Sequence, residues 1–350
     1  NAYKTQQSYF IKLLVNANNA IDTAHATRCP LPFQSCMVED CIGRGKSLQE
    51  GGAIYNFTGP QGFGIANVAD SLAVMRKLVF EDGVISMAEM KQALADNFGK
   101  GATNKRAMEL TTEAAKMLDA EGKEVNADLI KAIYMGFKTA SHISADKKAR
   151  YDEMLKLIAD VPKYGNDLRE VDLFAREVGQ TYTKPLLAHT NPRGGMFHAG
   201  LYPVSANVPL GHQAGASPDG RLSNTPIADG VGPMSGRDVK GPTATANSVS
   251  RLDLGDASNG TLLNQKFHPS ALAGEMGLEK FVAYLRGFFD QKGMHVQYNV
   301  ISRETLLDAQ AHPENYKTLV VRVAGYSALF TTLSRSLQDD IINRTEQGGI

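Results

Sequence analysis

Three cysteines near the start of the chain are the first residues whose chemistry has to be explained. Cys29, Cys36 and Cys41 fall within 13 positions, and thiolates act both as metal ligands and as nucleophiles. No second pair of Cys or His residues stands at ligand spacing from them, and three is an odd number for a disulfide framework. We therefore predict no metal site and free thiols in a reducing cytoplasm, with Cys36 and Cys41 buried.

A glycine-rich stretch over residues 51–64 and eight dispersed histidines are the next candidates for binding or catalysis. Gly62-Phe63-Gly64 begins like a dinucleotide-binding GxGxxG motif, but Asn67 occupies the third glycine position and no strand precedes the motif. The stretch is therefore predicted to be a structured loop with close backbone approach. Five histidines are interpreted as polar loop residues or hydrogen-bonded strand residues: His189, His198, His212, His268 and His295.

Close to the C-terminus, a strand-like run breaks at a single glycine between bulky residues. The segment reads Val321-Arg322-Val323-Ala324-Gly325-Tyr326-Ser327-Ala328. A glycine at a strand-to-loop junction is most simply required for a positive φ. The string around Gly325 nevertheless favours a chemical role for its α-carbon over this purely conformational one.

The elements that would position Gly325 alternate between helix and strand. Helical periodicity runs through residues 10–24, and Ser86 with Glu89 three residues later predicts a capping box. Residues 99–161 are rich in Ala, Lys, Glu, Asp and Met and read as a peripheral helical module. After Pro162, helical patterns alternate with strand-like runs at 200–210, 260–267, 294–300 and 318–323. This alternation predicts an α/β architecture with a largely buried sheet.

The composition of the 350 residues is that of a globular protein, with 43% apolar residues, 33 Gly and 14 Pro. Lys and Arg number 37, as do Asp and Glu, and no Lys/Arg tract occurs. This balance argues against nucleic-acid and membrane-surface partners and favours a small neutral molecule or another protein. No apolar run approaches the roughly 18 residues of a membrane span. Because Asn1 leads almost at once into a helical pattern, we expect the chain to be part of a longer one.

The string Arg322-Val323-Ala324-Gly325-Tyr326-Ser327 resembles the C-terminal signature of the glycyl radical enzymes. This family includes pyruvate formate-lyase, glycerol and propanediol dehydratases, choline trimethylamine-lyase and the arylacetate decarboxylases. Other family-like strings follow in order at 28–33, 51–70, 190–195, 200–208, 218–221, 226–230, 241–244, 260–269 and 290–301.

The resemblance implies an α/β fold, the C-terminal half of the family's ten-stranded α/β barrel with a helical insertion. Residues 1–98 and 162–228 would belong to the pyruvate formate-lyase-like barrel domain. Residues 99–161 would be the helical insertion, and residues 229–350 the glycine radical domain.

The resemblance further implies that Gly325 carries an organic radical. Loss of an α-hydrogen leaves an electron shared between the amide nitrogen and the carbonyl, which needs a planar α-carbon that a side chain would hinder. A radical-SAM activating enzyme, with a [4Fe–4S] cluster and S-adenosylmethionine, would install the radical, and no cofactor would stay bound. Oxygen destroys such a radical, so the loop is expected to be buried at rest and to swing out for activation. A homodimer is also a family expectation.

In this family the glycyl radical oxidises a cysteine in a Gly-Cys-x-Glu loop, and the thiyl radical then attacks the substrate. Cys36 does not fit this pattern, because Glu39 lies three residues after it and its flanks resemble a later helix of the family. We therefore expect the thiyl cysteine and its general-base glutamate to lie before Asn1.

Among the branches of the family, the strings at 259–272 and 289–297 are most similar to those of the B12-independent diol dehydratases. Tyr202, in Gly-Leu-Tyr-Pro-Val-Ser-Ala-Asn, resembles a strand-end residue that lines the substrate pocket, although a core-filling role is equally open. The implied reaction is dehydration of a small diol, propane-1,2-diol or glycerol, in the cytoplasm or in a bacterial microcompartment. The alternatives are an arylacetate decarboxylase, a C–N or C–S lyase, a formate acetyltransferase-like enzyme, or a non-enzymatic spare-part subunit that carries the radical.

Overall fold

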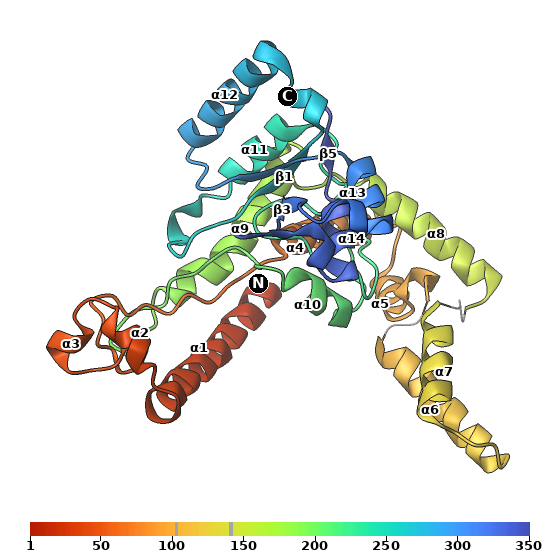
Figure 1. The fold of residues 1–350 in the computed structure, drawn as a ribbon. Coiled ribbons are helices and arrows are strands. Elements are labelled where there is room, and N and C mark those ends of the chain that lie inside the picture. Colours follow the sequence, from red (N-terminus) through yellow and green to blue (C-terminus); the bar gives the residue numbers. More distant parts are fainter. Residues whose placement is uncertain (102–103, 140–142) are drawn as a thin grey trace.

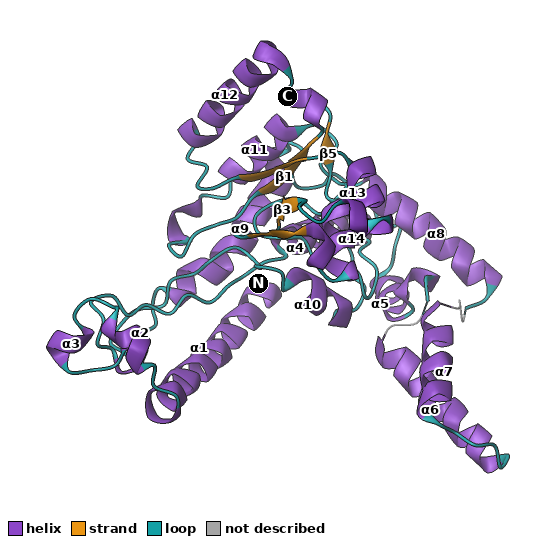
Figure 2. Cartoon of the chain, in the orientation of Figure 1, coloured by secondary structure: helices purple, strands orange, loops and turns teal. Residues whose placement is uncertain are grey.

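The computed structural model describes residues 1–101, 104–139 and 143–350. Its helices are α1 (Ala2–Arg28), α2 (Pro32–Cys36), α3 (Cys41–Arg44), α4 (Ile65–Val74), α5 (Met87–Ala95), α6 (Asn104–Ala120), α7 (Ala127–Thr139), α8 (Ala145–Asp160), α9 (Arg169–Leu186), α10 (Asn207–Gln213), α11 (Pro242–Ser250), α12 (Gly274–Asp290), α13 (Arg303–Ala311) and α14 (Arg335–Asn343). Its strands are β1 (Asn264–Phe267), β2 (Gln297–Val300), β3 (Val320–Arg322), β4 (Ser327–Leu329) and β5 (Glu346–Gln347). Helices surround a small central group of strands (Figure 2).

The central strands are parallel. Strand β1 pairs with β2 on one side and with β5 on the other, and Asn264 lies opposite Gln297 at the start of the β1–β2 register. Single parallel bridges extend the arrangement to earlier segments, joining Gln61 to Gly200 and Leu201 to Thr261. Parallel strands covered by helices are the α/β architecture that the sequence predicts.

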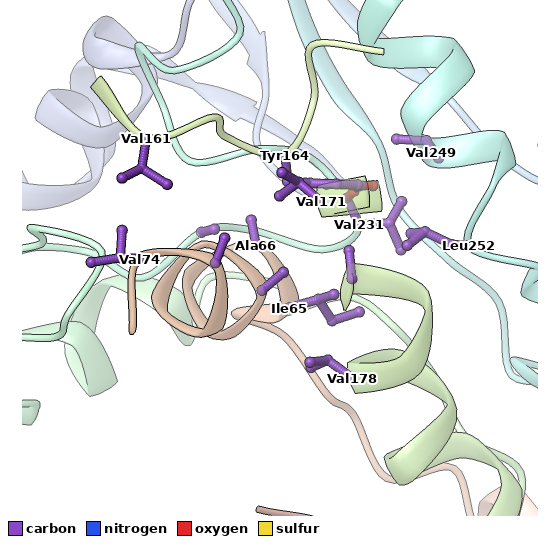
Figure 3. Close-up of a cluster of buried hydrophobic side chains, with 14 of the residues drawn as sticks. Ile65, Ala66, Val74, Val161, Tyr164, Val171, Val178, Val231, Val249 and Leu252 are labelled. Atoms are coloured by element: carbon purple, nitrogen blue, oxygen red, sulfur yellow. Dashed lines mark hydrogen bonds between the residues drawn. The ribbon is translucent and has the colours of Figure 1, made fainter. Parts of the chain in front are cut away.

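The main core lies where α4 and α9 pack together beneath the strands. Figure 3 shows Ile65 of α4 and Val178 of α9 pointing toward one another in a cluster of buried side chains. Tyr164 lies in the same cluster with its ring fully buried, and its hydroxyl donates to the carbonyl of Val231 at 2.8 Å. A buried hydroxyl needs such a partner, because leaving it unpaired is unfavourable.

A second, smaller core supports the segment around Gly325. Strands β3 and β4 form an antiparallel hairpin that packs against α13 and α14. The buried residues of this second core are Leu306, Ala309, Val321, Val323, Phe330, Ile341 and Ile342. The hairpin is therefore fixed at its base and through Val323 in its turn, while Gly325 lies outside the core.

The helical region over residues 99–161 contains two different parts. Helices α6 and α7 pack on each other and extend away from the rest of the chain (Figure 1). Helix α8 instead contributes Tyr151, Met154 and Ile158 to the main core. The insertion predicted over 99–161 also includes 102–103 and 140–142, which lie outside the described residues.

Two local predictions can be compared directly with the structure. The capping box is confirmed, because Ser86 Oγ accepts the Glu89 N–H at 3.1 Å and Glu89 Oε2 accepts the Ser86 N–H at 2.8 Å. The strand expected over 200–210 is wrong in its second half, where α10 begins. Pro209 sits in the first turn of α10, where a missing N–H costs no intrahelical bond.

None of the described helices is both long and apolar enough to cross a membrane.

Candidate active site

Gly325 lies in the turn of the β3–β4 hairpin. Arg322 and Ser327 are the last paired residues, and the Val323 N–H donates to the Tyr326 carbonyl at 2.9 Å to close the turn. Gly325 has a φ of +83°, and a Cβ placed on it would lie 3.7 Å from Leu262 Cδ1. Glycine is thus required by the backbone conformation and not by lack of space.

Gly325 is exposed, whereas Val323 and Ala324 immediately before it are buried. The described residues therefore do not bury Gly325 itself, and burial of the loop at rest stays a prediction.

Gln297, the first residue of β2, binds the turn through its side-chain amide. Its buried side-chain Oε1 accepts the Gly325 N–H at 3.1 Å and the Arg322 Nε–H at 2.8 Å. Its Nε2 donates to Asn264 Oδ1 on the neighbouring strand and to the Val323 carbonyl at 3.5 Å. All four partners of this one amide lie in the β3–β4 hairpin or on strand β1.

Asn299, two residues further along β2, binds the hairpin at the main chain of Arg322. Its Oδ1 accepts the Arg322 N–H at 2.8 Å, and its Nδ2 donates to the Arg322 carbonyl at 2.8 Å. Side chains two apart on a strand point to the same face, so Gln297 and Asn299 act on the hairpin together.

A buried polar network continues behind the turn. Asn264 Nδ2 donates to Asp229 Oδ2, and Arg344 Nη2 lies 3.9 Å from the same carboxylate. Arg344 also pairs with Asp340 at 3.2 Å. Burial raises the pKa of Asp340, against the opposing effect of Arg344. Asn207 of α10 donates to Asp340 at 3.3 Å and so ties this network to the preceding part of the chain.

A second cluster of polar side chains lies deeper in the core and joins the segment before residue 228 to the segment after it. Arg237 donates from Nη1 to Asp70 at 3.0 Å and to Asp219 at 2.7 Å. Burial raises the pKa of Asp70 to about 6, although Arg237 opposes the shift. Breaking a buried pair leaves an uncompensated charge, so these contacts resist separation of the two parts.

Tyr202 lies at the end of the short strand segment that bridges to Thr261. Asn259 Nδ2 donates to the Tyr202 hydroxyl at 2.8 Å and to the Gly59 carbonyl at 3.2 Å. Because the hydroxyl accepts this bond, its own hydrogen remains free to donate elsewhere.

Leu201, the neighbour of Tyr202, is connected to the Gly325 turn through Leu262. The Leu262 N–H donates to the carbonyl of Leu201, next to Tyr202, at 3.2 Å, and the Leu262 side chain faces Gly325. Val204, two residues after Tyr202, has a φ of +58°, which is strained for a β-branched residue. Such strain clusters at functional sites.

Tyr182 of α9 lies beside Tyr202. Burial raises the pKa of Tyr182 well above its ordinary value, and the neighbouring Tyr202 adds to the shift. Its buried hydroxyl has no hydrogen-bond partner among the described residues. Tyr182 therefore fills space next to Tyr202 without a polar function of its own.

The three cysteines lie away from the turn. Cys36 ends α2 and Cys41 begins α3, and these helices lie at the far end of the molecule from β3 (Figure 1). Cys41 is buried as predicted, but Cys36 is exposed, so that part of the prediction is wrong. Helix α2 has only five residues, and only Ser35 of it is buried.

Two of the five predicted histidines form side-chain hydrogen bonds with a serine, and His212 lies in helix α10 instead of a loop or strand. His198 Nδ1 lies 2.7 Å from Ser258 Oγ, and His268 Nδ1 lies 2.6 Å from Ser270 Oγ. His295 differs from the prediction, because its buried Nδ1 has no partner among the described residues. Burial and the nearby Arg322 lower the pKa of His295.

One group of metal-binding residue types converges in the described part of the chain. Ligand atoms of His268, Glu304 and Glu346 all lie within 4.8 Å of one another. Glu346 Oε2 already accepts the Arg303 N–H at 2.6 Å, and Glu304 is exposed. Exposed acidic groups often gather in this way without an ion, so their proximity alone does not indicate a metal centre.

Gln297, Asn299 and Asn259 are the residues that the sequence did not single out. The first two stand at alternate positions of the predicted strand 294–300, a spacing that places both on one face. Their partners lie 25 residues or so later, and no local pattern reveals such a pairing.

Comparison with known proteins identifies the family. Residues 1–211 match the family described as pyruvate formate lyase-like, and residues 227–331, which include Gly325, match the glycine radical family. The probable dehydratase YbiW of Escherichia coli is 40% identical over 353 residues, covering 99% of this chain and 38% of that protein. Trans-4-hydroxy-L-proline dehydratase of Clostridioides difficile is 35% identical, with 99% and 38% covered.

Two solved structures are similar throughout this chain. One, from a study of 1,2-propanediol dehydration in Roseburia inulinivorans, has 61% identity and a TM-score of 0.88, covering 99% of this chain and 41% of that one. The glycerol-bound B12-independent glycerol dehydratase of Clostridium butyricum has 47% identity and a TM-score of 0.82, with 99% and 38% covered.

The chain thus spans about two fifths of the length of these relatives. The similarity confirms the expected α/β barrel fold. Together, the matched segments and the glycine turn lead to one conclusion: this chain belongs to the glycyl radical enzymes of the pyruvate formate lyase-like family.

Proposed function

We propose that the protein is a B12-independent diol dehydratase in which Gly325 carries the radical. The observation that supports this assignment is the Gly325 turn. Its backbone conformation requires glycine, and its peptide nitrogen is held by Gln297. An activating enzyme must reach the α-carbon, so the loop would have to swing out of its cover in the complete protein. We further propose that a radical-SAM enzyme, with a [4Fe–4S] cluster and S-adenosylmethionine, removes the hydrogen atom under anaerobic conditions.

The thiyl cysteine is proposed to lie outside these 350 residues. Cys36 has the wrong spacing to Glu39, and it lies on the short exposed end of α2, far from the Gly325 turn. In the complete protein, the residues that form the rest of the barrel in the longer relatives would cover the open side of the turn and bring this cysteine to it.

The proposed substrate is propane-1,2-diol. The support is the 61% identity to the structure described for 1,2-propanediol dehydration, against 47% for the glycerol-bound dehydratase. The thiyl radical would take a hydrogen atom from C1, and a glutamate would remove the proton of the C1 hydroxyl. The C2 hydroxyl would then leave as water with that proton, and return of the hydrogen atom to C2 would give propanal.

Tyr202 is proposed to face the diol. Its hydroxyl is oriented by Asn259, so its hydrogen is free to donate to a substrate oxygen. Leu262 connects this position to Gly325, which is consistent with a pocket beside the radical loop.

The assembly and location follow the same reasoning. We propose a cytoplasmic homodimer, in the open cytoplasm or within a bacterial microcompartment. Three free cysteines are compatible with a reducing compartment. Sedimentation of the full-length protein tests the dimer, and a single monomeric species would contradict it.

The substrate assignment is tested with the full-length protein after anaerobic activation. Propane-1,2-diol, glycerol, trans-4-hydroxy-L-proline and 4-hydroxyphenylacetate are supplied separately, and each product is quantified. We expect propanal to form at least tenfold faster, by kcat/KM, than 3-hydroxypropanal forms from glycerol. Turnover of only hydroxyproline or the arylacetate would contradict a diol dehydratase while leaving the radical at Gly325 intact.

A further inference from the structure

The side chain of Gln297 is the only described side chain with a hydrogen bond to the main chain of Gly325. It is 7% exposed and belongs to β2, whereas Gly325 is exposed and belongs to a turn. A rigid, buried group thus holds the one peptide nitrogen that adjoins the proposed radical carbon.

The orientation of this amide is fixed by its neighbours. A backbone N–H and a guanidinium can only donate, so the oxygen of Gln297 must face Gly325 and Arg322. Its nitrogen must then face Asn264 Oδ1 and the Val323 carbonyl, which only accept. No flip of the amide would satisfy these four partners.

The hydrogen bonds continue from Gln297 through Asn264 to the carboxyl group of Asp229, all donating in the same direction. Asn264 accepts from Gln297 and donates from its own Nδ2 to the carboxylate of Asp229. Every bond in the chain from the Gly325 N–H to the Asp229 carboxyl group therefore runs in the same direction. Hydrogen bonds arranged in one direction polarise and strengthen one another.

We propose that Gln297 is a positioning residue that ties the peptide nitrogen of Gly325 to strand β2 and so holds the radical loop in the position seen in this structure. This inference rests on the proposed function, because the position of the loop matters only if Gly325 is activated and used. Opening the loop requires that Gln297 release the Gly325 N–H and the Arg322 guanidinium together. The bonds therefore set how often the α-carbon reaches an activating enzyme, and how well a radical is kept once formed.

Two variants of the full-length protein isolate this role. Gln297→Met keeps the length of the side chain and removes the acceptor. Gln265→Met is the matched control, because Gln265 is equally buried at 6%, lies on β1 and bonds to Tyr284 and Pro242, away from the turn.

The first readout is hydrogen–deuterium exchange at the Gly325 amide in the unactivated protein. We expect Gln297→Met to exchange at least fivefold faster there, and Gln265→Met to stay within twofold of wild type. Exchange in α9 serves as the reference for global folding. Unchanged exchange at Gly325 in a folded Gln297→Met protein would overturn the proposal.

The second readout is the radical itself, followed by EPR after anaerobic activation. We expect Gln297→Met to gain its radical at a faster initial rate and to lose it at least threefold faster than wild type. A merely structural role would lower the yield in both methionine variants without changing either rate constant. If wild type forms no radical, the proposed function fails, whereas the exchange result still decides whether Gln297 holds the loop.

Discussion

Asn299 binds Arg322 through both main-chain groups of the arginine, as a neighbouring strand would, with two bonds of 2.8 Å. This side chain replaces a strand pairing that β2 and β3 do not make in the described sheets. It lies two residues from Gln297 on the same face of β2, so the radical hairpin is attached to strand β2 by two amides at alternate positions.

Asn299→Leu should loosen the hairpin. The substitution leaves the Arg322 N–H buried without an acceptor, while the Arg322 carbonyl retains only a 3.3 Å bond from Arg344. We expect the free energy of unfolding to fall by about 2 kcal/mol, measured by chemical denaturation of the full-length protein. Val300→Ala, at the next and half-exposed position of β2, should change it by less than about 0.5 kcal/mol. Equal effects of the two variants would contradict a role for the Asn299 amide.

The variant Tyr202→Phe distinguishes the two roles considered for Tyr202, which are binding the substrate and packing in the core. The change removes only the hydroxyl, so a hydrogen bond to substrate would be lost while the ring still packs. We expect kcat/KM for the diol to fall by about tenfold, with little change in the free energy of unfolding. Tyr182→Phe is the control, because its hydroxyl is buried without a partner and its removal should be neutral or stabilising. Retention of full activity by Tyr202→Phe would assign Tyr202 to the core.

Asp238 should make the stability of the protein depend on pH. Burial raises the pKa of Asp238 to about 6, against the hydrogen bonds from Thr345 and Gln347. A carboxyl with a raised pKa binds its proton more tightly when folded. Its contribution is therefore present below about pH 4 and is lost as the pH rises through 6.

Asp238→Asn should remove this dependence. Between pH 4.5 and 7, wild type is expected to lose about 2 kcal/mol more free energy of unfolding than the variant. Asp290→Asn, at the exposed end of α12, provides the comparison and should follow wild type. Parallel pH profiles for wild type and Asp238→Asn would show that Asp238 does not titrate in this range.

The sequence could predict the features that depend on local pattern. The Ser86–Glu89 capping box follows from a spacing of three residues, and the turn at Gly325 follows from a glycine at the end of an apolar run. The start of α10 could not be read in this way, since the run from 200 to 210 is apolar and helix and strand are ambiguous in short apolar runs.

The polar contacts of the site depend on tertiary structure and were beyond local pattern. Gln297 and Asn299 meet Arg322 and Gly325 only because β2 lies beside the hairpin. The exposure of Cys36 likewise reflects how α2 sits on the fold, not the composition around it. The extent of the helical insertion and the roles of Gly325 and Tyr202 stay predictions.

The most direct test of the radical assignment is EPR of the full-length protein after anaerobic activation, with glycine labelled at its α-carbon with ¹³C. Wild type should give a doublet from the one remaining α-hydrogen, broadened by the label, and Gly325→Ala should give none. Gly236→Ala is the matched control, because Gly236 is also exposed, has a φ of +81° and has open space around it, so it imposes similar backbone strain. It should keep the doublet. An unchanged doublet in Gly325→Ala would contradict the radical at Gly325.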